Sequence, residues 1–261
     1  MGLQQALAKF AFTLSLLQVP SSVRRVASEM CEDARADGVD ALEIRFAPQL
    51  HVRAGAALEE IVDAALEGAA GRAGILLCGL YGEPPEVLES LVSAAASRRG
   101  VVGIDLAGGP STSDRWSMRD YVWPFRRAAE VGLGRTVHAG EGRPAAEIGF
   151  AIRELGAQRI GHGCSVLEDP AVVELALERG VTFEACLTSN VHTGVYRSVA
   201  EHPLPKWLSA GLRACVCSDN TLLSQTTASE EHRGALSIPG MTPELLDRAI
   251  AFGHQGAFHR S

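Results

Sequence analysis

The sequence lacks several features that mark common protein classes. Its 6 cysteines form no Cys-x-x-Cys pair, which argues against a zinc ribbon or a redox dithiol. It has no uninterrupted apolar run of about 18 residues, so no membrane span is expected. Basic residues are outnumbered, giving a net charge of −7, whereas nucleic-acid-binding domains usually carry a basic face. We therefore expect neither a membrane nor a nucleic-acid partner.

The chain also lacks linker-like stretches, internal repeats and low-complexity tracts. Its 261 residues, of which 46% are apolar, suffice for one large α/β domain, so residues 1–261 are expected to form a single domain. Several cysteines lie inside apolar runs, as Cys78 does, and are expected to be buried hydrophobic residues. Such usage fits a reducing, cytoplasmic location.

What the sequence does contain is a repeating alternation. Short apolar runs typical of strands are each followed by a longer stretch with helical spacing, which predicts a parallel sheet with helical crossovers. A closed parallel barrel has eight strands, but only seven runs are found, and the chain opens on a helix-like segment. The prediction is a TIM-type (β/α) barrel without its first strand, or an open sheet. The predicted strands are 41–46, 74–80, 101–106, 135–138, 159–161, 181–187 and 213–217.

Several helix boundaries are also predicted. Ser21 or Ser22 can cap a helix that runs to about Ala36 and stops at Gly38. Residues 84–99 show apolar positions at helical spacing. Two further helices are expected over 144–155 and 170–178, each with a proline in the first turn, where its missing N–H costs nothing.

Polar residues gather directly after the predicted strands, at the rim where a parallel barrel collects its catalytic groups. Four clusters stand out: residues 136–141, 159–163, 187–192 and 217–220. Each has a simpler interpretation when taken alone. A single histidine is often a structural residue, and Asp219 at a strand end is as compatible with a helix N-cap as with a metal ligand. For Ser189 or Asn190 we favour a helix cap, with a secondary role in shaping the pocket.

Together the clusters favour chemistry. His138, Glu141, His162 and Asp219 all lie at strand ends of one α/β chain. Imidazole and carboxylate ligands suit a zinc ion with one position open for water. Zinc lowers the pKa of that water to about 7, which predicts a hydrolytic site.

These residues resemble the adenosine deaminase family of the amidohydrolase superfamily, and the resemblance covers roughly residues 4–258. The stretches that carry it occur in the family's order. They are Leu42-Glu43-Ile44-Arg45-Phe46-Ala47-Pro48, Gly103-Ile104-Asp105-Leu106-Ala107-Gly108, Thr136-Val137-His138-Ala139-Gly140-Glu141, Arg159-Ile160-Gly161-His162-Gly163, Thr188-Ser189-Asn190 and Ser218-Asp219-Asn220.

The resemblance implies a role for each matching residue. His138 and Asp219 resemble zinc ligands, and Asp219 would also contact the attacking water. Glu141 resembles the residue that protonates purine N1, and His162 the one that orients the zinc-bound hydroxide. Gly108 resembles a backbone contact to the purine. Asn220 stands where many members carry a second aspartate facing purine N7. The resemblance thus implies that His138 and Asp219 bind the metal, that Glu141, His162 and Asp219 take part in catalysis, and that Gly108 and Asn220 contact the substrate.

The implied reaction is the hydrolysis of adenosine or deoxyadenosine to inosine or deoxyinosine and ammonia, a step of purine salvage with a small-molecule nucleoside as substrate. The unrelated cytidine-type zinc deaminases carry a Pro-Cys-x-x-Cys signature, which is absent here. Motifs around the purine ring do not separate adenosine from adenine or a modified nucleoside, and they leave the oligomeric state open.

One departure from the family pattern matters. The family's first strand ends in His-x-His, which supplies two zinc ligands, and no His-x-His occurs in these residues. Three explanations are open. The one we favour is that the gene prediction starts too late or covers a fragment, and the second is that the chain is a naturally shortened, inactive relative. The third is that another chain or another metal arrangement completes the site. A non-catalytic binding protein is a further alternative, although Glu141, His162 and Asp219 are all retained. The 261 residues alone are expected to bind zinc weakly and to show little deaminase activity.

Overall fold

The computed structural model describes residues 5, 8–111 and 113–259. The chain forms two compact units. The N-terminal unit contains residues 8–135 together with the tail 257–259, and the C-terminal unit contains residues 136–256. Each unit is built from parallel strands and helices.

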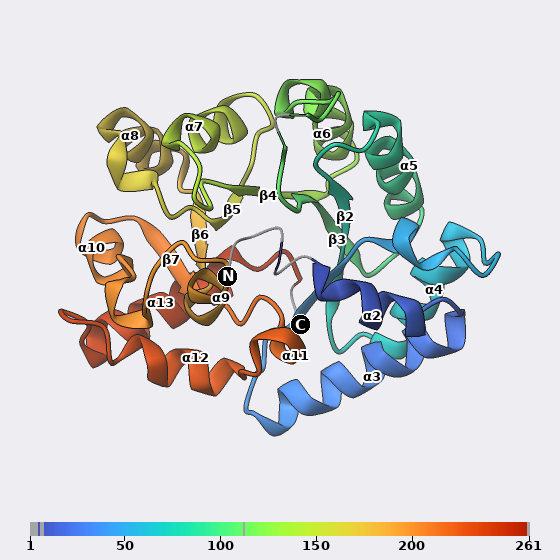
Figure 1. Ribbon diagram of the computed structural model, residues 1–261, viewed down its shortest axis with the longest axis horizontal. Coiled ribbons are helices and arrows are strands. Elements are labelled where there is room, and N and C mark those ends of the chain that lie inside the picture. Colours follow the sequence, from blue (N-terminus) through green and yellow to red (C-terminus); the bar gives the residue numbers. More distant parts are fainter. Residues whose placement is uncertain (1–4, 6–7, 112, 260–261) are drawn as a thin grey trace. The chain divides into compact units, whose positions relative to one another are not determined.

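The N-terminal unit contains a parallel sheet with strand order β1-β2-β3 (Figure 1). The middle strand is almost completely buried, as its apolar run predicts. Helices α3 and α4 pack against one another beside the sheet. The strands are β1 Glu43–Phe46, β2 Gly74–Leu80 and β3 Val101–Ala107, and the helices are α2 Phe10–Leu16, α3 Pro20–Ala36, α4 Leu58–Ala69, α5 Pro85–Ala96 and α6 Val122–Glu130.

The tail of the chain is fastened to the start of this sheet. Glu43, the first residue of β1, accepts hydrogen bonds from the backbone N–H groups of Phe258 (2.6 Å) and His259 (2.7 Å). The Phe258 ring lies against two glycines, and a Cβ placed at Gly134 would come within 2.3 Å of it, or at Gly103 within 3.0 Å. Glycine is therefore required at these positions because the ring occupies the space of a side chain.

The C-terminal unit contains a second parallel series, with strand order β4-β5-β6-β7. Its strands are β4 Gly134–Ala139, β5 Arg159–His162, β6 Thr182–Ala185 and β7 Arg213–Val216. Its helices are α7 Ala145–Arg153, α8 Pro170–Arg179, α9 Leu187–His192, α10 Leu204–Ser209, α11 Thr221–Ser224, α12 Ala228–Ala235 and α13 Pro243–Gly256. Helix α13 packs on β7, where Gly253 allows a close approach to Cys215.

Helix α8 shows how local sequence sets an element's limits. The Asp169 carboxylate caps the helix by accepting from the N–H of Ala171 (2.9 Å), and Pro170 occupies the first turn. Gly180 ends the helix with a left-handed backbone, at a φ of 61°. The predicted helix over 170–178 is therefore confirmed with its end shifted by one residue.

Two boundary predictions were wrong. Helix α3 begins at Pro20, and its N-cap is Val19, so neither Ser21 nor Ser22 caps it. A proline at the first helical position starts the helix because its fixed φ is already helical. Pro144 precedes α7 as its N-cap and does not lie in the first turn. The predicted stop at Gly38 is confirmed by its φ of 85°.

The described helices include none with the length and apolar character that a membrane-spanning segment needs.

Candidate active site

The polar residues predicted to carry chemistry lie at the carboxyl ends of the strands. His138 is in β4, His162 ends β5, and Asp219 follows β7. All three belong to the C-terminal unit, as does Glu141. The parallel arrangement brings the ends of consecutive strands to the same edge, as expected for a β/α fold.

Three of these side chains form one cluster. The Nε2 atom of His162 lies 3.6 Å from Oε2 of Glu141, and the two side chains are only 3% and 9% exposed. The rings of His138 and His162 meet edge to face, with 5.1 Å between their centroids. A carboxylate and two imidazoles thus share one largely buried space, and buried acid–base groups of this kind are typical of functional sites.

Glycine makes the approach of the two strands possible. A side chain at Gly161 would place its Cβ 3.2 Å from Nδ1 of His138, so the imidazole occupies the space above a residue without a side chain. Gly140, at a φ of 72°, turns the chain between His138 and Glu141. A Cβ there would lie 2.6 Å from Ile148. The glycines of these motifs therefore serve close packing around the histidines.

His162 is held from its other side by an amide. The side chain of Asn190 lies completely buried, and its Nδ2 is 3.0 Å from Nδ1 of His162. The opposite end of that amide accepts from the thiol of Cys164, with 3.5 Å between Sγ and Oδ1. Burial, together with the charge of Glu141, raises the pKa of Cys164 to about 12. The thiol therefore stays protonated and acts as a donor.

Asp219 is bound by a neighbouring hydroxyl. The Oγ of Ser189, which is 4% exposed, donates to Oδ2 of Asp219 across 2.6 Å. The amide of Asn220 donates to the same oxygen across 3.2 Å. Because Ser189 and Asn190 are adjacent, one short helix holds both Asp219 and His162.

The cap prediction for Ser189 and Asn190 was wrong. Both residues lie inside α9, whose N-cap is Cys186. Their side chains bond to Asp219 and His162 and satisfy no helix terminus. Local preference for caps was overridden by tertiary contacts. Asp219 is not a cap either, because the N-cap of α11 is Asn220.

Two site residues carry a backbone conformation that side chains rarely adopt. The φ angles of His162 and Asp219 are 65° and 59°, within the left-handed region that favours glycine. Strain of this kind clusters at functional sites, where the surrounding structure holds it.

Gly108 lies in the N-terminal unit, directly after β3, and its φ is 84°. Glycine adopts this conformation readily because it has no Cβ, and the missing side chain suits the expected approach of a flat ring to the backbone. In the C-terminal unit, the amide of Asn220 is engaged with Asp219 through Nδ2 and with the hydroxyl of Ser224 through Oδ1 (3.3 Å).

The donors present are chemically suited to zinc but too few. His138 and Asp219 offer an imidazole nitrogen and a carboxylate oxygen, whereas catalytic zinc usually has about three protein ligands. Within residues 5, 8–111 and 113–259, no group of three or more His, Cys, Asp or Glu side chains is placed to hold a metal ion. The described residues therefore do not by themselves make a complete catalytic zinc site.

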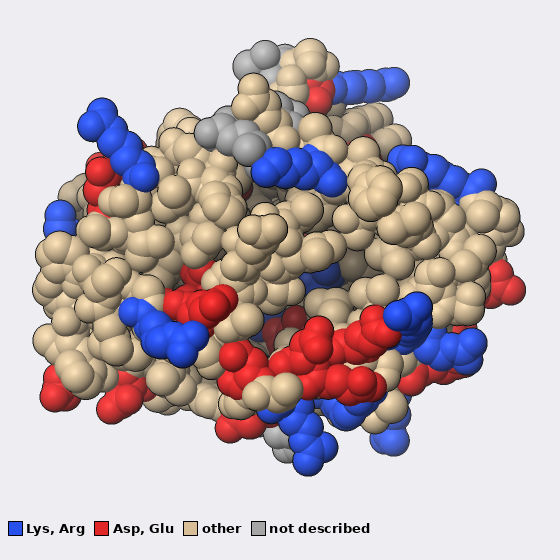
Figure 2. Space-filling model, turned by 60° about the horizontal axis from the view of Figure 1, so that its bottom comes forward, with Lys and Arg blue, Asp and Glu red and all other residues tan. Residues whose placement is uncertain are grey.

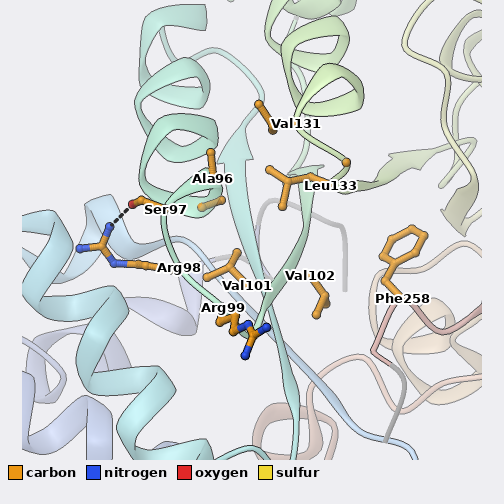
Figure 3. Close-up of a pocket in the computed structure, with 11 residues that line it drawn as sticks. Ala96, Ser97, Arg98, Arg99, Val101, Val102, Val131, Leu133 and Phe258 are labelled. Carbon is orange, nitrogen blue, oxygen red and sulfur yellow. Dashed lines mark hydrogen bonds between the residues drawn. The ribbon is translucent and has the colours of Figure 1, made fainter.

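A pocket of about 470 Å³ lies in the N-terminal unit, between the ends of α5 and α6 and the start of β3 (Figure 3). Its lining includes Arg98, Arg99 and Phe258 and none of the residues predicted from the motifs. Arg98 is engaged by Asp63 at 2.6 Å. On the face drawn in Figure 2, acidic and basic side chains are both present at the surface.

Comparison with known proteins agrees with this geometry. The family model for adenosine deaminase matches residues 1–260. An adenosine deaminase of Enterococcus faecalis is 34% identical over 238 residues, which are 88% of this chain and 69% of that protein. A probable adenosine deaminase of Dictyostelium discoideum is 32% identical over 98% of this chain, but the chain spans only 34% of that longer protein.

Solved structures show the same fold. An adenine deaminase from Arthrobacter aurescens matches with a TM-score of 0.90 and 27% identity, covering 99% of this chain and 80% of that one. An amidohydrolase from Burkholderia ambifaria with bound zinc matches with a TM-score of 0.84 and 25% identity, covering 93% and 70%.

The fold is thus a TIM-type barrel of the metal-dependent hydrolase kind, and seven of its strands lie among the described residues. The chain belongs to the adenosine deaminase family, whose named members are hydrolytic aminohydrolases. The resemblance seen in the motifs is confirmed.

Proposed function

We propose that this chain carries the acid–base machinery of a deaminase that hydrolyses adenosine or deoxyadenosine. Water adds to C6 of the purine, ammonia leaves, and inosine or deoxyinosine forms. The observation that best supports this is the buried pair of Glu141 and His162, 3.6 Å apart and beside His138. Family membership supports the same reaction class.

In this proposal each side chain has a separate task. Glu141 delivers a proton to purine N1, which makes C6 more electrophilic. His162 orients the attacking water through its imidazole. Asp219, held by Ser189, contacts the same water. Gly108 and Asn220 are the proposed backbone and amide contacts to the purine ring.

Zinc is the proposed cofactor, and His138 and Asp219 are its proposed ligands in this chain. When bound, zinc lowers the pKa of a coordinated water to about 7. The zinc-containing relative from Burkholderia ambifaria supports this choice of metal. Because the described residues bring too few donors together, turnover by the 261-residue chain is expected to be weak.

The proposal is tested by ammonia release from adenosine and deoxyadenosine in zinc-supplemented buffer. Turnover above background that falls by about 10²-fold or more in Glu141→Gln supports it. Glu178→Gln is the matched control, because Glu178 is an exposed carboxylate on α8. Absence of turnover at every zinc concentration would favour an inactive relative or a binding protein.

A second candidate is deamination of free adenine or a modified 6-aminopurine. The Arthrobacter aurescens structure, with a TM-score of 0.90, is an adenine deaminase. A panel of adenine, N6-methylated nucleosides and adenosine at equal concentration separates the candidates by their relative kcat/KM.

A further inference from the structure

We infer that Asn190 is a positioning residue that holds His162 in the tautomer with its proton on Nε2, and that Cys164 sets the direction of the Asn190 amide. This inference rests on the proposed function, because it concerns the same site. It assigns roles to Asn190 on α9 and to Cys164 after β5, in addition to the roles predicted from the motifs.

The two ends of the His162 ring face groups of opposite hydrogen-bonding character. On one side, Nε2 faces Oε2 of Glu141 at 3.6 Å. An oxygen of a carboxyl group accepts hydrogen bonds whether the group is ionised or carries its proton on the other oxygen, so this side favours a proton on Nε2. On the other side, Nδ1 faces Nδ2 of Asn190 at 3.0 Å. An amide nitrogen only donates, so Nδ1 must present its lone pair. Both neighbours therefore select the same neutral tautomer.

An amide can face either way, and its direction must be set by a third group. The Oδ1 atom of Asn190 lies 3.5 Å from the Sγ of Cys164. A thiol is a weak donor and a poor acceptor, so it favours the oxygen of the amide on its own side. Burial, which raises the pKa of Cys164 to about 12, keeps the S–H proton in place. The amide nitrogen is then left to face His162.

The backbone of Asn190 prevents the side chain from moving away. Its N–H donates to the carbonyl of Cys186 (2.9 Å). Its carbonyl accepts from the N–H groups of Val195 (2.9 Å) and Tyr196 (3.2 Å). The Tyr196 hydroxyl donates to the carbonyl of Cys164 (3.3 Å). Tyr196 thus links Cys164, which directs the amide, to Asn190, which carries it.

The consequence for chemistry is directional. With the proton on Nε2 and the lone pair of Nδ1 occupied, His162 presents one defined N–H towards Glu141. A ring with the opposite tautomer would present a lone pair to the carboxylate and lose this contact. In a catalytic site, the wrong histidine tautomer leaves geometry intact while lowering kcat.

The test reads the tautomer directly. The chain is labelled with ¹⁵N-histidine, and the His162 ring signals are assigned by their loss in His162→Gln, at a fixed pH of about 8. The unaltered chain is expected to show a pyrrole-like Nε2 and a pyridine-like Nδ1. Asn190→Asp keeps the side-chain size but only accepts hydrogen bonds, so it is expected to bring a proton onto Nδ1. Asn190→Leu is expected to give a mixture of both tautomers.

Cys164 is tested with a pair of variants. Cys164→Ala removes the donor and is expected to give mixed tautomers, whereas Cys164→Ser supplies an O–H donor and is expected to retain the Nε2–H form. Cys31→Ala, at a buried cysteine of α3, is the control for loss of a thiol. In turnover, Asn190→Asp is expected to lower kcat on the order of 10²-fold with little change in KM.

The outcomes separate this inference from the proposed function. An unchanged Nε2–H tautomer in Asn190→Asp and in Asn190→Leu overturns it, whether or not the chain deaminates adenosine. A tautomer that responds to Asn190 and to Cys164 supports it even when no turnover is found. If Asn190→Leu does not fold, the near-isosteric Asn190→Asp and the Cys164 pair still decide.

Discussion

The hydroxyl of Ser189 donates to the carboxylate of Asp219 across 2.6 Å. Ser189 is buried, whereas Asp219 is exposed at the end of β7. A buried hydroxyl therefore anchors an exposed carboxylate and limits its rotation. Groups that orient a metal-binding carboxylate are part of the site's function, since they fix where the oxygen points.

Ser189→Ala is expected to weaken zinc binding about 10- to 100-fold, the usual cost of losing a partner that orients a metal ligand. The measurement is the apparent Kd from competition with a zinc-chelating dye. Ser189→Thr retains the hydroxyl and is expected to recover most of the affinity. Ser209→Ala, which loses only a bond to the carbonyl of Pro205 (2.7 Å), is the control. Equal affinity in Ser189→Ala and Ser209→Ala would contradict the prediction.

Zinc itself is expected to bind the 261-residue chain weakly, with clearly less than one ion per chain after dialysis. The reason is that His138 and Asp219 fall short of the usual set of about three protein ligands. Elemental analysis of the purified chain measures this, with His138→Ala and Asp219→Ala each expected to lower the content further. One tightly held zinc per chain together with full adenosine turnover would refute the expectation.

Acid sensitivity is expected from His202. Burial, together with the neighbouring charge of His162, lowers its pKa from 6.5 to about 3. The imidazole accepts from the N–H of Leu204 (3.2 Å) and packs against Tyr196 and Trp207. The folded chain keeps this ring neutral, whereas the unfolded chain protonates it below about 6.5. The free energy of unfolding therefore falls as pH falls from about 6.5 towards 3.

The size of this effect is roughly 2 kcal/mol between pH 7.5 and 5, at 1.36 kcal/mol for each pKa unit. Urea unfolding at both pH values measures it. His202→Asn retains an acceptor for the Leu204 N–H but cannot become charged, so its stability should depend less on pH by this amount. His192→Asn, at an exposed position of α9, should leave the pH dependence unchanged. A variant His202→Asn with the same pH dependence as the unaltered chain would disprove the assignment.

The contact between Phe258 and Gly134 predicts a coupled pair of substitutions. Gly134→Ala forces a Cβ to within 2.3 Å of the Phe258 ring and is expected to destabilise the chain by about 1–3 kcal/mol. Phe258→Ala loses packing and is expected to cost a similar amount. In the double variant the clash is gone, so the two costs should not add.

A double-mutant cycle by urea unfolding measures the coupling between Gly134 and Phe258. Gly132→Ala with Phe258→Ala is the comparison pair, because a Cβ at Gly132 meets nothing within 4 Å, although its φ of 79° makes alanine strained there. Strict additivity for Gly134 and Phe258 would show that the ring does not press on that glycine.

The strands could be predicted well from sequence because buried parallel strands are short, continuous apolar runs. The run 74–80 matches β2 in full, whereas the run 181–187 was too long, since β6 ends at Ala185 and α9 begins at Leu187. Apolar residues continue across that junction, so composition gives no sign of the change from strand to helix.

The site was predicted only in part. His138, Glu141 and His162 could be located because each ends or follows a strand, and the structure brings them together. The cap prediction failed for Ser189 and Asn190 because serine and asparagine often cap helices. Their actual hydrogen-bond partners are set by tertiary contacts that the local sequence does not show. Cys164 was not singled out, although its position two residues after His162, beside Gly163, was a usable signal. The hydrogen bond from the Phe258 N–H to the Glu43 carboxylate joins residues that are far apart in sequence, so no local sequence pattern could predict it.

The left-handed backbone at His162 and Asp219 has a cost that selection for folding alone would remove. Glycine adopts these φ angles without penalty, whereas other residues lose on the order of 1–2 kcal/mol at each position. His162→Gly and Asp219→Gly would therefore relieve local backbone strain while removing the groups that we propose act on substrate. Selection for stability alone would favour glycine at both positions, so an imidazole and a carboxylate there are what the proposed function leads one to expect, at the expense of stability.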